Sequence, residues 1–415
     1  MYRRKSILIV ALLVITLFFF TLQYLQLLLP TPKNTIKFRS EIEDLIYQEL
    51  QELDDKYNVP QRLVKVEEFL GNINNFTGFT KIELLSELWK EANFWPSAQF
   101  LTNISSTNIG TILNALKRTR IIKADLDNRG TQLKLLLTLL GGQQCIFKPK
   151  WYDKEKIIEG PVYAGKDRYG SEIVAFYLSV LLNKPLVPVS VERNISLKYD
   201  VLPVARMRLL NTSFEKEDKR VCIYGKCFYC KPADPICDNT HNMLTGALIF
   251  NIKKTFSNYR SPWQRTYKKG KNAIWQDDQN YCRSVKSKLN KKRILDLIDT
   301  AIFDFLIQNG DRHHYETLDD KVVWLDNGKG FGNPNVQHID ILAPLYQCCI
   351  IRESTWTSLQ NLSGKNLVRY MKLMPNIENV LTEQHLKAME ERLFIIYATV
   401  QYCRKKKSGN KKISL

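Results

Sequence analysis

Two aspartates in the C-terminal third of the sequence have the type and spacing that phosphoryl transfer requires. Asp311 stands in the run Gly310-Asp-Arg-His-His-Tyr-Glu316, and Asp326 follows fifteen residues later in Leu325-Asp-Asn-Gly. Phosphoryl transfer needs one carboxylate that accepts or orients the acceptor hydroxyl, and another acid that holds the divalent metal on the phosphates. Asp311 begins a loop and Asp326 ends the β-rich run Lys321–Leu325, so a short hairpin would bring both acids to one cleft.

Upstream residues complete a kinase-like constellation. Lys148 ends the apolar run Cys145-Ile-Phe-Lys, the position of a phosphate-anchoring lysine, and Glu172 heads the next helix, where an ion pair would fix that lysine. The run Asn128-Arg-Gly-Thr-Gln-Leu-Lys134 offers one glycine for a turn and directs Gln132 and Lys134 at phosphate. The letters differ from those of protein kinases: neither G-x-G-x-x-G nor D-F-G occurs, and Glu316 replaces the Asn found five residues after the catalytic Asp.

The elements that must position these side chains follow from periodicity and turn residues. Strand patterns meet at a Gly141-Gly142 turn, a helix follows them, and later segments are mainly helical, which indicates a small β-rich lobe followed by a helical lobe. The predicted elements are helices at Glu41–Leu53, Lys81–Ala92, Ser171–Leu182 and Arg293–Gln308, strands at Ile121–Ala124, Thr131–Leu140 and Gln144–Lys148, and further helices within Ser363–Tyr402.

The N-terminus predicts a membrane anchor. Met1–Lys5 carries three positive charges, and Ile7–Leu29 then runs for 23 residues without a charge, which is long enough to span a bilayer about 30 Å thick. The basic flank predicts a cytoplasmic tail at residues 1–5, a signal-anchor helix at 6–29 and a lumenal remainder. A cleaved signal peptide is the alternative, although the apolar run is long for one and no A-x-A site precedes Pro30.

Sequons and cysteines agree with a lumenal body. All nine cysteines lie beyond the apolar run, and their clustering suggests disulfides in an oxidising compartment. A zinc site within Cys222–Cys237 is the alternative. The odd number leaves one thiol, for which the buried strand residue Cys145 is the candidate. Five sequons predict N-glycosylation, at Asn75, Asn103, Asn194, Asn211 and Asn361.

The net charge of +19 indicates an acidic partner. A lumenal location excludes nucleic acid, which leaves glycosaminoglycans, acidic membrane surfaces or phosphate-bearing substrates. Part of the excess lies in a basic tail at residues 404–415, which we interpret as a solvated end.

Several blocks in fixed order resemble the secretory-pathway kinases related to the Golgi casein kinase. They are Arg129-Gly-Thr-Gln-Leu-Lys134, Phe147-Lys-Pro149, Tyr224-Gly-Lys-Cys-Phe-Tyr-Cys230, Asp311-Arg-His-His-Tyr-Glu316, Leu325-Asp-Asn327 and Leu342-Ala-Pro-Leu-Tyr-Gln-Cys-Cys349. Within that family, further pieces resemble the glycosaminoglycan xylosylkinase branch, namely Pro262-Trp, Arg265-Thr-Tyr, Gly270-Lys, Ile350-Ile-Arg and Ser354-Thr-Trp356. The resemblance runs from Thr119 to Cys403.

The resemblance implies an α+β, atypical two-lobed protein-kinase-like fold. An N-terminal transmembrane anchor would be followed by a lumenal stalk and N-terminal helices at residues 30–118. The catalytic domain would span 119–403, with a small lobe at about 119–250 and a disulfide-stapled, mainly helical large lobe at about 251–403. The implied disulfides are Cys222–Cys237, Cys227–Cys230, Cys282–Cys348 and Cys349–Cys403.

The resemblance also implies roles for individual residues. Asp311 would be the catalytic base, and Asp326 would bind metal together with Asp167, which stands where the family has Glu. Lys134 and Glu172 would form a supporting ion pair. The remaining nucleotide contacts would come from Gln132, Lys148, Glu316, Asp326 and an adenine-facing hinge of Ile249, Phe250, Asn251 and Ile252.

The implied reaction moves the γ-phosphate of ATP, with Mn²⁺ or Mg²⁺, to the 2-hydroxyl of xylose in a Gal-Xyl linker on a proteoglycan core protein. Aromatic and polar side chains that could contact this sugar are Tyr346, Trp356, Trp263 and Arg352. The protein would be a type II Golgi membrane protein, with a member of its own family as a further partner. A secreted Ser/Thr kinase for acidic motifs and a pseudokinase that activates a partner are the alternatives.

Overall fold

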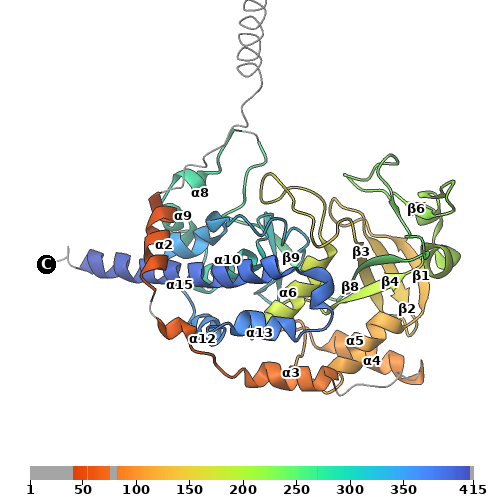
Figure 1. The fold of residues 1–415 in the computed structure, drawn as a ribbon, viewed down its shortest axis with the longest axis horizontal. Helices are drawn as coiled ribbons and strands as arrows, with labels where there is room; N and C mark the ends of the chain where they lie inside the picture. Colours follow the sequence, from red (N-terminus) through yellow and green to blue (C-terminus); the bar gives the residue numbers. More distant parts are fainter. Residues whose placement is uncertain (1–40, 54, 75–81, 269, 412–415) are drawn as a thin grey trace, which may run out of the picture. The chain divides into compact units, whose positions relative to one another are not determined.

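The computed structural model describes residues 41–53, 55–74, 82–268 and 270–411 (Figure 1). The predicted cytoplasmic tail and anchor at residues 1–29 lie outside these ranges, as does the sequon at Asn75. Within the described ranges, no helix combines the length and the apolar character needed to cross a membrane. Residues Leu45–Leu415 group into one compact unit, which contains every predicted nucleotide and metal residue.

A five-stranded antiparallel sheet forms the β-rich part of this unit. Its strand order is β1-β2-β3-β8-β4. The second strand begins four residues later than predicted, because the amide of Asp127 donates to the carbonyl of Lys134 (3.0 Å) and closes residues 127–134 into a loop. The strands are β1 (Ile121–Leu126), β2 (Leu135–Leu139), β3 (Gln144–Pro149), β4 (Ser190–Ile195) and β8 (Leu244–Phe250).

Helix α6 (Tyr169–Leu181) connects the sheet to the helical part of the unit. It is buried along its whole length and contacts β4, β8 and helix α10 (Lys291–Ile307). Two of the helices before the sheet also pack on it, since α5 (Ile109–Arg118) contacts β4 and Trp89 of α4 (Leu85–Phe94) donates to the carbonyl of Leu140 (3.0 Å). The other helices before the sheet are α2 (Glu41–Gln51) and α3 (Val64–Asn74), and α3 contacts α5.

Helix α10 (Lys291–Ile307) is the centre of the helical part, and α15 lies beside it in Figure 1. It ends at Ile307, and its C-cap residue Gln308 takes the left-handed conformation (φ 58°). At Gly310, two residues later, a Cβ would lie 2.1 Å from Val162 Cγ1. The other helices are α7 (Met207–Leu210), α8 (Ile274–Asp277), α9 (Tyr281–Lys286), α11 (Ala343–Cys348), α12 (Glu353–Asn361), α13 (Asn366–Lys372), α14 (Ile377–Val380) and α15 (Glu383–Lys411).

The predicted hairpin between the two aspartates is present. Strands β10 (His314–Leu318) and β11 (Lys321–Val323) pair antiparallel, and β9 (Ser257–Arg260) adds to the other side of β10. The two turn residues, Asp319 and Asp320, both have positive φ (46° and 61°), as the tightest hairpin turn requires.

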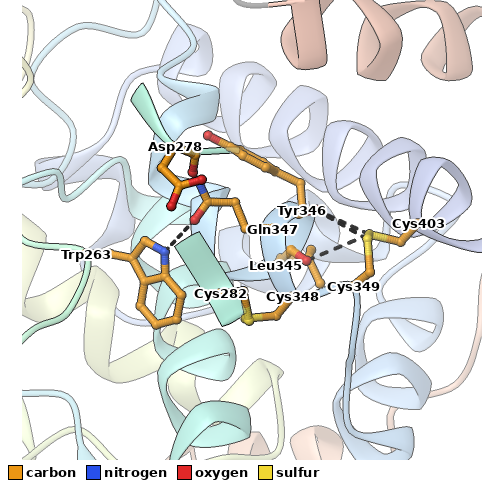
Figure 2. The surroundings of a disulfide bond; sticks show 9 residues. All are labelled: Trp263, Asp278, Cys282, Leu345, Tyr346, Gln347, Cys348, Cys349 and Cys403. Carbon is orange, nitrogen blue, oxygen red and sulfur yellow. Dashed lines mark hydrogen bonds between the residues drawn. A yellow bond between two sulfur atoms is a disulfide. The ribbon is translucent and has the colours of Figure 1, made fainter. Parts of the chain in front are cut away.

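Four disulfides join the pairs that the resemblance implies, and Cys145 is the one free, buried cysteine. Cys222–Cys237 joins β6 (Val221–Ile223) to β7 (Ile236–Cys237) in a small sheet that β5 (Ser213–Glu215) completes, and Cys227–Cys230 lies in the loop between β6 and β7. The paired sulfurs leave no thiolates for the alternative zinc site. Figure 2 shows the other two, Cys282–Cys348 and Cys349–Cys403, which tie α11 to α9 and to α15.

The sequon asparagines inside the described ranges differ in exposure. Asn194 on β4 and Asn211 after α7 are exposed, whereas Asn103 and Asn361 are half-buried. Glycosylation at these positions stays a prediction.

Candidate active site

A single cleft of about 510 Å³ gathers the residues that the sequence singled out for nucleotide, metal and base. It is bounded by the five-stranded sheet, by the loop before α6 and by the β10–β11 hairpin. Every predicted member of this group lines it: Gln132, Lys134, Lys148, Asp167, Glu172, Ile249, Phe250, Asn251, Ile252, Asp311, Glu316 and Asp326.

Lys148 of β3 is the charge centre of the cleft. Its Nζ donates to Asp167 Oδ2 (3.0 Å), Glu172 Oε1 (2.6 Å) and Asp326 Oδ1 (2.7 Å). The lysine is buried. Burial alone would lower its pKa, but the carboxylates of Asp167, Asp326 and Glu172 outweigh that effect and hold the pKa of Lys148 well above its ordinary value. The ammonium therefore stays charged and links three separate segments of the chain.

Glu172 bonds to Lys148 and not to Lys134, which corrects the ion pair that the resemblance implied. The first turn of α6 lies against β3, whereas Lys134 stands in the loop before β2. Glu172 is also fixed by Asn327, whose backbone amide donates to Oε1 (3.0 Å) and whose Nδ2 donates to Oε2 (3.3 Å). A buried carboxylate that accepts three hydrogen bonds is held in one orientation.

Asp167 and Asp326 fit the predicted metal. Their oxygens converge on the same Lys148 nitrogen from two different loops, and carboxylate oxygens suit Mg²⁺ and Mn²⁺. The Asp326 side chain keeps 65% of its surface exposed to the cleft. Among the described residues, no cluster of three or more His, Cys, Asp or Glu side chains is arranged to hold a metal alone. Metals in ATP sites take their remaining ligands from phosphates and water.

The loop around Asp326 is held in an uncommon backbone conformation. Asp326 has φ 55°, a region that non-glycine residues occupy mainly where surrounding contacts enforce it. Arg312 supplies those contacts: it donates to the carbonyl of Leu325 and to Asn327 Oδ1 (2.9 Å) on either side of Asp326. The positive charge of Lys148 holds the pKa of Asp326 far below its ordinary range, so this carboxyl is ionised at all physiological pH values.

Arg312 is itself anchored in the core. Its Nε and Nη2 donate to the two oxygens of Asp304 on α10, at 2.8 and 2.7 Å. Both side chains are almost completely buried. The pair therefore links α10 to the loops of Asp311 and Asp326 through one planar guanidinium.

Asp311 is oriented by a tyrosine from the segment after β9. Tyr267 Oη donates to Asp311 Oδ1 at 2.5 Å, and Arg265 Nε donates to the carbonyl of Gly310 (3.1 Å). Burial raises the pKa of Asp311 above its ordinary value, while the hydrogen bond from Tyr267 acts in the opposite direction. With Oδ1 occupied by the phenol, Oδ2 is the oxygen available to accept a proton.

The remaining nucleotide residues lie around the same cleft. Gln132 is almost completely buried, and Lys134 is half-exposed in the loop before β2. Burial raises the pKa of Glu316 on β10 above its ordinary value. The hinge residues Ile249 to Ile252 line the cleft at the end of β8, where their apolar side chains could cover an adenine ring.

The four acceptor candidates separate into two groups. Trp263 lines a smaller hollow of about 60 Å³ that also reaches Asp311, and its Nε1 donates to Gln347 Oε1 (2.8 Å; Figure 2). Tyr346, Arg352 and Trp356 line neither of these two hollows. Tyr346 is buried in α11, and Arg352 is paired with Asp296 and Asp299 on α10.

Trp356 packs in the core and not beside an acceptor. Its ring meets Tyr57 and Tyr397 edge to face, with centroids 6.2 and 5.8 Å away, and the Arg404 guanidinium lies 5.0 Å from its centroid. An acceptor contact is therefore unsupported for Trp356 and for Arg352, because packing and ion pairs already occupy both side chains.

Sequence reasoning gave no role to Tyr267, Arg312, Asn327 or Lys329, although the cleft depends on them. Arg312 and Asn327 stand inside the quoted motifs, directly after Asp311 and Asp326. Lys329 lines the cleft and lies 3.8 Å from Asp167 Oδ1. Arg312, Asn327 and Lys329 could have been found from the sequence, because they are polar and lie within three residues of Asp311 or Asp326. No neighbouring residue in the sequence marks Tyr267 as a partner of Asp311.

Known proteins match this chain in sequence and in fold. Residues 87–412 match the family described as Golgi casein kinase, C-terminal, Fam20. A glycosaminoglycan xylosylkinase homolog of Drosophila melanogaster is 44% identical over 328 residues, which is 77% of this chain and 78% of that protein.

Solved structures of related proteins have a similar fold. The structure of hydra Fam20 with sugar matches with a TM-score of 0.73 and 39% identity, and covers 78% of this chain and 97% of that one. The Golgi casein kinase with Mn/ADP bound matches with a TM-score of 0.68 and 26% identity, over 85% and 92% of the two chains. These matches confirm the predicted kinase-like fold of mixed helix and sheet, and the chain belongs to the Golgi casein kinase family, Fam20.

Proposed function

We propose that this chain is a glycosaminoglycan xylosylkinase, which transfers the γ-phosphate of ATP to the 2-hydroxyl of xylose in the linkage region of proteoglycans. One observation carries the proposal: the base Asp311, the acids Asp167 and Asp326, and Lys148 line one cleft. They do so in a chain that is 44% identical to a xylosylkinase homolog.

The charged residues of the cleft would have different roles in phosphoryl transfer. Asp167 and Asp326 would hold Mn²⁺ or Mg²⁺, which when bound offsets the negative charge of the ATP phosphates. Lys148, fixed by Glu172, would bind a phosphate oxygen through its ammonium. Use of ATP and Mn²⁺ is supported by the related Golgi casein kinase, whose structure has Mn/ADP bound.

Asp311 would act on the acceptor. Its free Oδ2 would orient the xylose hydroxyl and take its proton as the new P–O bond forms. Tyr267 holds the other oxygen at 2.5 Å, so the carboxylate cannot rotate away. Trp263 borders the same hollow and offers an aromatic surface near the acceptor.

A direct assay tests this proposal against the protein-kinase alternative, which the casein kinase relatives favour. The purified lumenal part would receive ATP and Mn²⁺ with either a Gal-Xyl acceptor or an acidic Ser peptide. We expect phosphate on the disaccharide, and transfer only to the peptide would overturn the proposal. Asp326→Ala should abolish transfer while the protein stays folded, which also distinguishes a working kinase from a pseudokinase.

We also propose that the protein is a Golgi membrane protein with a lumenal catalytic domain. The family description names a Golgi kinase, and four disulfides are typical of an oxidising compartment. An uncleaved anchor at residues 6–29 predicts that the full-length protein remains with membranes after alkaline carbonate extraction, whereas a cleaved signal peptide predicts release. Binding to another family member belongs to the same set of proposals.

A further inference from the structure

The segment at residues 251–273 has an unusual charge composition. Its sequence contains seven Lys and Arg residues and no Asp or Glu. It starts at the hinge of the nucleotide cleft, passes through β9 and ends just before α8. We call the part from Lys253 to Lys271 the cationic strip.

The cationic strip runs along the catalytic residues. Lys254 lines the nucleotide cleft, and Arg260 on β9 pairs in register with His314. The amide of Ser261 donates to the carbonyl of His313 (2.9 Å), and Tyr267 contacts Asp311. A ligand lying on the strip would therefore pass directly beside the acceptor position.

Most of these charges are not neutralised by the protein itself. Lys253, Arg260, Lys268 and Lys271 are exposed, and none of them forms an ion pair with Asp or Glu in the described part of the chain. Arg260 Nε instead donates to the neutral Gln264 (2.9 Å). Exposed charges of one sign at a cleft mouth attract ligands of the opposite sign.

The shape of the strip favours an extended polypeptide as that ligand. In the described residues, β9 is the edge strand of the sheet β11-β10-β9, and all four of its residues are exposed. An edge strand presents unpaired backbone groups that a second extended chain can match. A lipid surface offers acidic groups but no such backbone.

We propose that the cationic strip binds the acidic polypeptide that flanks the sugar acceptor on its core protein. This inference rests on the proposed function, because the xylose must be attached to a protein for its flanks to reach the strip. Asp and Glu side chains near the glycosylated residue would pair with the exposed cations while the sugar enters beside Asp311.

Three acceptors test the proposal: free Gal-Xyl, a Gal-Xyl glycopeptide with Asp and Glu flanks, and the same glycopeptide with neutral flanks. We expect kcat/KM to be about tenfold higher for the acidic glycopeptide than for the neutral one at low salt, as a few exposed ion pairs would give. The ratio should fall towards one as NaCl screens the charges.

A variant with Lys253→Gln, Arg260→Gln, Lys268→Gln and Lys271→Gln should lose the preference and keep its kcat/KM on free Gal-Xyl. The matched control removes four exposed lysines elsewhere, through Lys90→Gln, Lys123→Gln, Lys216→Gln and Lys286→Gln, and should keep the preference.

Equal kcat/KM for the acidic and neutral glycopeptides with the unaltered protein would overturn the proposal, as would a preference that survives in the strip variant. Binding to vesicles of anionic lipid that the strip variant loses, without any glycopeptide preference, would assign the strip to a membrane surface instead. Phosphorylation of none of the three acceptors would refute the proposed function, on which this inference rests, whereas equal rates on the two glycopeptides with normal transfer to free Gal-Xyl would refute this inference alone. If the strip variant does not fold, the salt dependence of the unaltered protein decides the question.

Discussion

Replacing Arg312 by methionine should both destabilise the protein and slow phosphoryl transfer. Arg312 supplies two hydrogen bonds to the buried Asp304, at 2.7 and 2.8 Å. The Asp304 carboxylate has only one other hydrogen-bond partner in the described residues, Asn309 Nδ2 at 3.4 Å. Removing one member of a buried pair leaves an uncompensated charge and costs about 3–5 kcal/mol of unfolding free energy. For a protein of this size the melting temperature should fall on the order of 10 °C.

The same substitution removes the contacts to Leu325 and Asn327 that hold Asp326 at φ 55°. A misplacement of about 1 Å in a catalytic group can reduce the rate about 100-fold, and we expect a loss of that order in kcat/KM on Gal-Xyl. Thermal unfolding and steady-state transfer on the same preparation measure the two effects.

A double variant separates stability from positioning. Asp304→Leu with Arg312→Met removes both charges, so unfolding free energy should recover to within about 1–2 kcal/mol, whereas transfer should stay low because nothing then holds the Asp326 loop. Arg283→Met, at an exposed arginine on α9, is the matched control and should change neither quantity. Recovery of transfer in the double variant, or an unchanged melting temperature in Arg312→Met, would refute this reasoning.

Three further substitutions test other parts of the site and fold. Tyr267→Phe removes a hydrogen bond that lowers the pKa of Asp311, so that pKa should rise. The acid limb of kcat against pH should therefore move to higher pH. The other charged groups that face this carboxyl are His313, Lys329 and Asp326. An unmoved limb would contradict this. Gly328→Ala places a Cβ 2.6 Å from Asp167 Cγ, so the Mn²⁺ concentration for half-maximal activity should rise at least about tenfold; an unchanged requirement would argue against Asp167 as a ligand. Removing the Cys349–Cys403 disulfide, which closes 54 residues, should cost about 4 kcal/mol of unfolding free energy, and an unchanged melting temperature would exclude that contribution.

Sequence patterns predicted the parts of the cleft that depend on local geometry. Asp311 and Asp326 flank a two-residue hairpin, and Glu172 lies in the first turn of α6, the helix that follows the Lys148 strand β3, so short-range spacing placed each pair. The same spacing could not find the hydrogen bond from Tyr267 to Asp311, because the two residues are 44 positions apart and belong to different elements.

Residue type alone was a poor guide to the acceptor. Trp356 has the aromatic surface that sugars favour, but Tyr57 lies about 300 positions earlier in the chain and packs against it in the core. Arg352 likewise neutralises Asp296 and Asp299, which are buried acids on α10. Such long-range packing cannot be read from local periodicity.

The central claim is that Asp311 acts as the base and Asp326 binds the metal. Calorimetric titration with Mn²⁺ and ADP, paired with the transfer assay, tests this claim most directly. Asp311→Asn should bind Mn²⁺ and ADP like the unaltered protein while transferring phosphate to Gal-Xyl about 100-fold more slowly or worse. Asp326→Asn should lose both binding and transfer. Unchanged binding by Asp326→Asn, or normal transfer by Asp311→Asn, would contradict the account.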